Sequence, residues 1–548
     1  MKNISSFFSK KTDIIIPVFL FSILIIWGVL NAPLKETFEY NIDEGIVSIQ
    51  SLLHLRGFQL YKEIWSDQPP IFIVILSLWY KMFGASFYCG RILVLIFSTF
   101  LALTFYLTIK NLWGRIGAFA AYVFLILSMS YMRLSVSIMI GLPALTLAMA
   151  SIYLAALYTK SKLKYQLILS GILMALSLQT KFNTFLLIPV IALGILRVRR
   201  LWLATVLFTY LAIMAVFFYP DFHLFIPQLV KPHFTLLNSD KTHLPVTYYM
   251  LLQDYDIALL ALPGIILSVK KMDWHFFAPF SWLLLNSAML LTYKPVWYHY
   301  YPLISIPACW LAAISISKFF SINMLQGWLP KKNTFDALDV LLRWFTAGLI
   351  ILSIITLPTK YHRMRSSLQG KTSFQERQIL ELLLKYKHNT RWIFSDIPSF
   401  AFSTGMLIPP EIAVTSVKRE LASESAGDYF VRILEKYTPE QILLSSTYEY
   451  SPKIISYIQK NYIKIYDGYE QKTRNYSYPN FDFPISYLWE PIGRYLPARM
   501  QIIADKWFYD LVWHSLQIPV FRIRKISGWA VNTTRVKIFI RKDISRES

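Results

Sequence analysis

Two adjacent carboxylates, Asp43 and Glu44, have the residue type and position best suited to chemistry in this 548-residue chain. They follow the first long apolar run, residues 14–30, after a short aromatic approach. Consecutive side chains point in different directions, so one carboxylate can face a cavity while the other holds the loop or a metal ion. Acidic residues between membrane spans are costly and usually mark a functional site. The competing interpretation is an acidic cap at the start of a helix.

Further polar residues could complete a site around this pair. Asp67 and Gln68 stand immediately before Pro69-Pro70, at the end of the same loop. Basic side chains stabilise negative charge that develops on a leaving group such as a phosphate. Such side chains occur at the outer ends of several apolar runs. The candidate binding residues are therefore Asp67, Gln68, Arg91, Lys181, Lys294, His299 and Tyr300.

The composition places these residues in a membrane protein. The mean hydropathy is +0.43, with 55% apolar and only 16% charged residues, which excludes an ordinary soluble protein of this length. Uncharged runs of about 15–25 residues match a hydrocarbon core of about 30 Å. The net charge of +23 falls largely in short loops, where it sets orientation and does not indicate nucleic-acid binding. The two cysteines form neither a disulfide framework nor a metal-ligand spacing.

The uncharged runs predict about 11 transmembrane helices. Basic residues alternate between loops, and the positive-inside rule places the N-terminus in the cytoplasm and the Asp43 loop outside. The short run 71–80 is predicted to be an interfacial helix, because a crossing there would invert the later loops. The predicted spans are 14–30, 92–109, 116–132, 142–159, 167–180, 182–196, 201–219, 257–269, 276–293, 300–317 and 344–358.

The last third of the chain has a different pattern. Short strands at 392–395, 412–414, 442–445 and 462–466 alternate with helical patterns at 428–437 and 452–461, which predicts a small extracytoplasmic α/β domain. An amphipathic helix at 499–516 and strands at 520–526 and 535–540 follow, the strands forming a basic ribbon or membrane-surface patch. The predicted organisation is a transmembrane module at 1–358 with an external loop at 31–91, an α/β domain at 361–470 and an aromatic, basic extension at 471–548.

Taken together, the motifs resemble the GT-C superfamily of membrane glycosyltransferases, in the protein mannosyltransferase and aminoarabinose transferase branch. The Asp-Glu pair after the first span and the Pro-Pro that closes the loop are similar to the first external loop of that branch. The resemblance covers about residues 10–320. Two differences stand out: Gln68 precedes Pro-Pro where some relatives have lysine, and 133–143 lacks an acidic residue that many relatives have. The other matching motifs are Gly84 to Arg91, Trp113-Gly114-Arg115, Gly171 to Lys181 and His299-Tyr300-Tyr301-Pro302.

The resemblance implies a GT-C-like polytopic α-helical membrane fold and transfer of a monosaccharide from a polyprenyl-phosphate donor. The acceptor would be an extracytoplasmic lipid, glycan or protein, and the membrane a bacterial inner or plasma membrane. Such a transfer needs a base near the acceptor, a role that suits Asp43, and cations around the phosphate. Whether a divalent metal ion takes part is left open; its ligands would come from Asp43, Glu44 or Asp67. A transporter or flippase of lipid-linked sugar, and a structural membrane subunit, are the alternative interpretations.

Overall fold

The computed structural model describes residues 2–235, 254–271, 273–292, 296–320, 337–370, 372–414, 426–446, 450–471 and 533–544. Its helices include one at every predicted span position, which confirms where the apolar runs become helical. Those helices are α1 (Lys2–Asn31), α4 (Phe87–Trp113), α5 (Arg115–Leu127), α7 (Gly141–Ser161), α8 (Lys164–Leu178), α9 (Leu187–Gly194), α10 (Arg199–Phe218), α13 (Tyr255–Lys271), α14 (Trp274–Thr292), α15 (Pro302–Phe319) and α17 (Ala337–Leu368).

Four helical stretches within the described residues are long and apolar enough to cross a membrane by length and composition: Phe87–Trp113, Gly141–Ser161, Arg199–Phe218 and Tyr298–Phe319. The total of about 11 spans stays a prediction. The predicted pair of short helices on either side of Lys181 is confirmed, as α8 and as the 3₁₀ turn η1 (Phe182–Leu186) that continues into α9.

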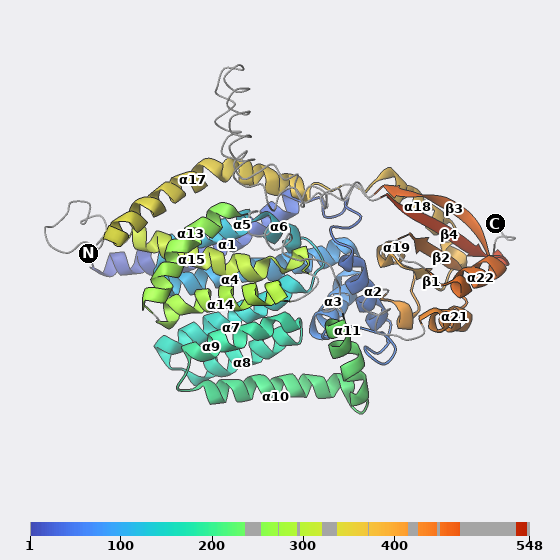
Figure 1. Cartoon of the computed structure of the whole chain (residues 1–548), viewed down its shortest axis with the longest axis horizontal. Coiled ribbons are helices and arrows are strands. Elements are labelled where there is room, and N and C mark those ends of the chain that lie inside the picture. Colours follow the sequence, from blue (N-terminus) through green and yellow to red (C-terminus); the bar gives the residue numbers. More distant parts are fainter. Residues whose placement is uncertain are drawn as a thin grey trace, which may run out of the picture.

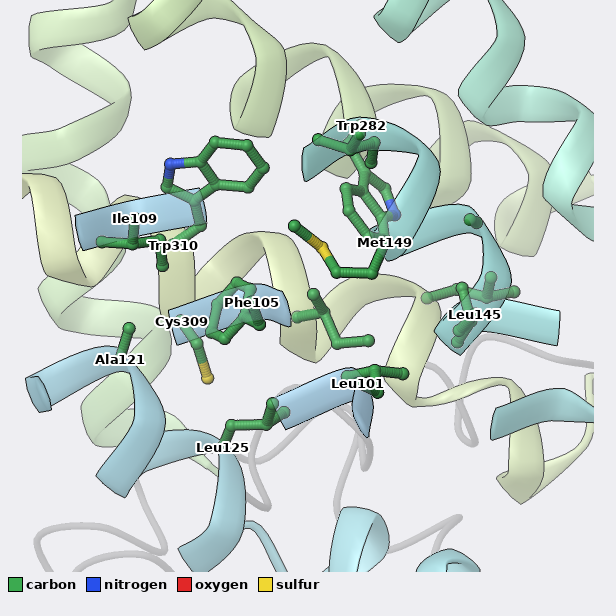
Figure 2. Close-up of a cluster of buried hydrophobic side chains, with 14 of the residues drawn as sticks. Leu101, Phe105, Ile109, Ala121, Leu125, Leu145, Met149, Trp282, Cys309 and Trp310 are labelled. Atoms are coloured by element: carbon green, nitrogen blue, oxygen red, sulfur yellow. The ribbon is translucent and has the colours of Figure 1, made fainter. Parts of the chain in front are cut away.

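Helix α4 lies inside the bundle. Figure 2 shows its Leu101, Phe105 and Ile109 among side chains of α5, α7, α14 and α15, including Trp282 and Trp310. All five of these side chains are fully buried. Apolar residues on most of its faces let α4 pack against several neighbouring helices, although Phe100 stays exposed. In contrast, α10 is only 22% buried and exposes large apolar side chains, as a lipid-facing helix would.

Two short helices connect α1 to α4. Helix α2 (Asp43–Leu55) begins at the carboxylate pair, and α3 (Ile71–Phe83) begins directly after Pro69-Pro70. Figure 1 shows both between the helical bundle and the sheet. At 13 residues, α3 is shorter than the roughly 20 residues that a span requires, in keeping with the prediction of a non-crossing helix.

The described residues of the last third include a four-stranded sheet of order β1-β2-β4-β3. The strands are β1 (Ile393–Ser395), β2 (Gln441–Ser445), β3 (Tyr462–Gln471) and β4 (Thr533–Arg541). Strand β1 is parallel to β2, and β4 is antiparallel to both β2 and β3. The accompanying helices are α18 (Phe374–Lys385), α19 (Pro398–Thr404), α21 (Ala426–Tyr437) and α22 (Pro452–Asn461).

Two expectations for this region need correction. Residues 412–414 are not a strand: a 3₁₀ turn, η7 (Pro410–Ile412), ends there, because proline fixes φ and cannot donate to a strand ladder. The extension does not stand apart from the α/β domain, since β4 lies between β2 and β3 and buries Val536, Ile538 and Ile540 on one face. The predicted helix 499–516 and strand 520–526 lie outside the described residues.

The α/β domain packs directly on the loop that carries the carboxylate pair. The rings of Phe38 and Phe400 lie 4.5 Å apart between centroids. A Cβ on Gly45 would lie only 2.4 Å from the backbone nitrogen of Ser399, so α2 and α19 approach as closely as glycine allows. The N–H of Thr372 donates to the carbonyl of Glu36 at 3.0 Å. The loop at 31–91 and the α/β domain therefore share one hydrophobic core.

Candidate functional site

The two carboxylates of the pair have opposite environments, and Glu44 is the buried one. Its side chain and that of Arg91 are both 0% exposed, with Arg91 Nη2 2.9 Å from Glu44 Oε2 and Arg91 Nε 3.2 Å from Oε1. The backbone N–H groups of Tyr40 and Ile138 also donate to this carboxylate. A buried carboxylate is stable only when paired and hydrogen-bonded, and Glu44 meets both conditions.

Arg91 holds the chain that leads to the pair. Its Nη1 donates to the carbonyls of Leu34 and Thr37, at 2.7 and 2.8 Å, and its Nη2 lies 3.3 Å from the carbonyl of Phe38. The guanidinium was predicted to contact a bound phosphate at the outer end of a span. Instead it is buried and directed at three backbone carbonyls and Glu44, so the geometry suits positioning of the loop.

Asp43, in contrast, is open to solvent. Its side chain is 40% exposed, and its Oδ2 lies 4.0 Å from Nδ1 of His299. His299 belongs to the 3₁₀ turn η5 (Tyr298–Tyr300), which immediately precedes α15. The side chain of His299 is 14% exposed. A carboxylate beside an imidazole, both accessible, can accept or relay a proton.

Lys181 lies on the other side of the same turn. Its Nζ is 4.9 Å from the centroid of the Tyr300 ring. Gly141 begins α7 at this point, and a Cβ there would lie 3.7 Å from Lys181 Nζ and 3.8 Å from the carbonyl oxygen of His299. A lysine ammonium beside the N-terminus of a long helix creates positive potential, which favours an anion. The structure thus gathers Asp43, His299, Tyr300 and Lys181 around one turn.

Asp67 and Gln68 lie in the loop whose end is fastened near Lys181 by a later residue. The N–H of Ile71, directly after the Pro-Pro pair, donates to the carbonyl of Gln179 at 3.0 Å, which fastens the loop end beside Lys181. A ring nitrogen of His233 lies 2.9 Å from the carbonyl oxygen of Asp67. Both Asp67 and Gln68 are half-buried. Lys294 lies outside the described residues.

The sequence interpretation missed a charged cluster near the same turn. Asp254 and Asp256 are buried and lie within ion-pair distance of Lys360, and the hydroxyl of Tyr301 donates to Asp254. A signal was present, since both aspartates stand directly before one predicted span and Lys360 directly after another. Arg133, also missed, donates to the carbonyl of Tyr40 at 3.2 Å.

The fit of a divalent metal ion was tested on the residues present. Within the described part of the chain, no three His, Cys, Asp or Glu side chains are grouped so that they could hold an ion. Both Glu44 oxygens accept from Arg91 and from backbone N–H groups. The described donor set therefore does not fit a metal ion at the carboxylate pair.

Both the sequence and the fold are similar to those of known membrane glycosyltransferases. A family model described as dolichyl-phosphate-mannose-protein mannosyltransferase matches residues 67–223. No curated protein matches the sequence. The structure of ArnT from Cupriavidus metallidurans bound to undecaprenyl phosphate is similar, with a TM-score of 0.59 at 9% identity, over 82% of this chain and 96% of that one.

A second group of similar structures comes from Archaeoglobus fulgidus. Its oligosaccharyltransferase in the apo form has a TM-score of 0.54 at 11% identity, over 96% of this chain and 88% of that one. The same organism's AglB with an inhibitory peptide and a dolichol-phosphate has a TM-score of 0.53 at 12% identity, with the same coverage. At these identities the likeness concerns the fold. With the family-model match, it confirms the resemblance to the GT-C superfamily that the motifs predicted.

Proposed function

We propose that this chain, which shares its fold with GT-C membrane glycosyltransferases, transfers a monosaccharide from a polyprenyl-phosphate donor to an extracytoplasmic acceptor. The observation that carries the proposal is that the two adjacent carboxylates differ in solvent exposure and in their partners. Asp43 is open beside His299, while Glu44 is buried and paired with Arg91. A catalytic carboxylate must reach the acceptor, and its support must hold the backbone rigid.

In the proposed reaction Asp43 orients the acceptor and takes its proton. The acceptor oxygen or nitrogen then forms a bond to the anomeric carbon of the sugar as the bond from that carbon to the phosphate oxygen breaks. The electron pair of the broken bond stays on the polyprenyl phosphate, whose negative charge increases. Preorganised cations stabilise such developing charge, and we assign this role to Lys181, whose ammonium lies beside the start of α7.

His299 and Tyr300 have supporting roles in this proposal. His299 lies 4.0 Å from Asp43, where an imidazole can accept or relay the proton that the carboxylate takes. The Tyr300 ring, buried under Lys181, keeps the ammonium directed to one side. Glu44 and Arg91 are proposed as positioning residues, which touch neither donor nor acceptor.

Two relatives of the fold support the lipid-phosphate part. ArnT was solved bound to undecaprenyl phosphate, and AglB in complex with a dolichol-phosphate. The proposal for this chain covers hexosyl and pentosyl donors alike.

The test is incubation of the purified protein with labelled polyprenyl-phosphate sugars, followed by quantification of free polyprenyl phosphate. We expect acceptor-dependent release from at least one donor. Lys181→Ala should weaken donor binding, measured by titration, because it removes the cation next to the phosphate. Lys453→Ala, which breaks an exposed ion pair on the α/β domain, serves as the control and should leave binding unchanged. Donor binding without release in the presence of membrane acceptors would favour a transporter or flippase.

A further inference from the structure

A buried ion cluster lies where helices of the bundle meet the external face. Asp254 and Asp256, at the start of α13, are 3% and 1% exposed. Nζ of Lys360, near the end of α17, is 2.6 Å from Asp256 Oδ1 and 3.4 Å from Asp254 Oδ1. Two buried carboxylates without a cation would be strongly destabilising, so Lys360 is required for their burial.

Asp254 extends this cluster to two more helices. Its Oδ2 accepts from the hydroxyls of Ser128 and Tyr301, each at 2.7 Å. Ser128 is the cap residue of α6 (Met129–Ser135), and Tyr301 immediately precedes α15. One carboxylate therefore joins α6, α13, α15 and α17.

Tyr301 is the residue through which the cluster reaches the proposed site. Its N–H donates to the carbonyl of Tyr298 at 3.1 Å, and that of Tyr300 donates to Trp297 at 2.9 Å, so the turn is a short hydrogen-bonded unit. A tyrosine hydroxyl fixed on Asp254 fixes the turn from its C-terminal end. His299, two residues earlier, is thereby held at its 4.0 Å separation from Asp43.

Helix α17 also contacts the loop that leads to Asp43. Beyond Lys360 it ends at Leu368, whose carbonyl accepts from the hydroxyl of Tyr40 at 3.3 Å. Burial, as the main cause, raises the pKa of Tyr40 to about 12, so this hydroxyl remains a donor at physiological pH. The hydroxyl of Thr37 donates to the carbonyl of Gly370 just beyond the helix. The same helix is therefore bonded to the turn that carries His299 and to the loop that leads to Asp43.

We propose that Lys360 is a positioning residue for the transfer reaction: through Asp254 and Tyr301 it fixes the His299 turn against Asp43. This inference rests on the proposed function of Asp43 and His299, and Lys360 itself touches neither. A displacement of about 1 Å at a reacting group can lower a rate about 10²-fold, so loosening the turn should affect turnover more than donor binding.

Two variants separate positioning from simple loss of folding. Lys360→Met removes the cation and keeps the length of the side chain, and Tyr301→Phe removes only the hydroxyl while all charges stay. Amide hydrogen exchange across 297–301 should be faster in both variants than in the wild-type protein. Lys453→Met, which breaks the exposed pair with Asp428, is the matched control and should leave exchange in this segment unchanged.

Turnover supplies the second measurement. We expect Lys360→Met to lower kcat about 10²-fold and Tyr301→Phe to lower it less, each with a donor Kd within about twofold of the wild type. In a His299→Ala background, Lys360→Met should lower kcat only slightly further, because both changes act through the contact between His299 and Asp43. Multiplicative losses in the double variant, or unchanged exchange across 297–301 in both single variants, would overturn the proposal. If no donor is turned over even by the wild type, the proposed function fails, while the exchange experiment still decides whether Lys360 fixes the turn.

Discussion

Replacing Glu44 by glutamine tests how the protein keeps Asp43 in place. The change preserves shape but removes the charge that pairs with the fully buried Arg91. It also turns one acceptor into an NH₂ group that must face existing donors, which are Arg91 and the N–H groups of Tyr40 and Ile138. Breaking one partner of a buried ion pair costs about 3–5 kcal/mol, because the other charge stays buried without compensation.

That cost predicts a local effect that can be measured. We expect the Tyr40 and Ile138 amides to exchange with solvent about 10²–10⁴-fold faster in Glu44→Gln, since each 1.4 kcal/mol corresponds to a factor of ten. Turnover should also fall, because the loop that carries Asp43 is no longer fixed. Combining Glu44→Gln with Arg91→Met should not restore stability, because the carbonyls of Leu34, Thr37 and Phe38 would then lose their donor as well.

The matched control is Glu376→Gln. Glu376 is also a nearly buried glutamate that accepts from a backbone N–H, but it belongs to the capping box of α18. Glutamine can keep this capping-box hydrogen bond, so Glu376→Gln should cost less than about 1 kcal/mol and leave the Tyr40 amide unaffected. Wild-type exchange at both Tyr40 and Ile138 in Glu44→Gln would refute the role given to the buried pair.

Three further outcomes are expected. Gly45→Ala should weaken the docking of the α/β domain and lower turnover, because its Cβ would meet the Ser399 backbone. The control Gly348→Ala, in open space on α17, should be neutral or slightly stabilising. Equal thermal midpoints for the two variants would contradict this expectation. Hydrogen bonds from Arg535 and Lys464 lower the pKa of Asp467 to about 2, so the stability that Asp467 contributes is present above its ordinary value of 3.8 and is lost as the pH falls towards 2. The difference in thermal midpoint between wild type and Asp467→Asn should therefore shrink over that pH interval, and a constant difference would argue against the ion pairs. A topology reporter fused after residue 360 should read as extracytoplasmic and one after residue 200 as cytoplasmic; the same side for both would mean that an odd number of predicted spans is wrong.

The helices could be predicted because long uncharged runs carry a local signal. Their positions follow from hydropathy alone, as the match at α7 and α15 illustrates. The place of β4 could not be predicted in this way. Its alternation was recognised at 535–540, but its neighbours β2 and β3 lie far away in the sequence, and pairing across such distances leaves no local trace.

The sequence predicted which residues belong to the candidate site better than it predicted the role of each residue. The sequence singled out Asp43, His299 and Lys181, which the structure brings to one turn. It could not tell which of Asp43 and Glu44 faces solvent, since adjacent residues on an unplaced helix are equivalent. Arg91 looked like a cation at a span end, and only its contacts with three carbonyls and Glu44 give it another task.

The most direct test of the central claim compares Asp43→Asn with Asp428→Asn, an exposed aspartate of the α/β domain that also has a basic neighbour. Release of labelled polyprenyl phosphate and donor affinity are measured for both variants at matched folding. We predict that Asp43→Asn lowers turnover about 10²–10⁴-fold with donor affinity preserved, because the amide keeps the shape but cannot take the proton. Asp428→Asn should behave as the wild type. Near-normal turnover in Asp43→Asn would contradict the account and remove Asp43 from the mechanism.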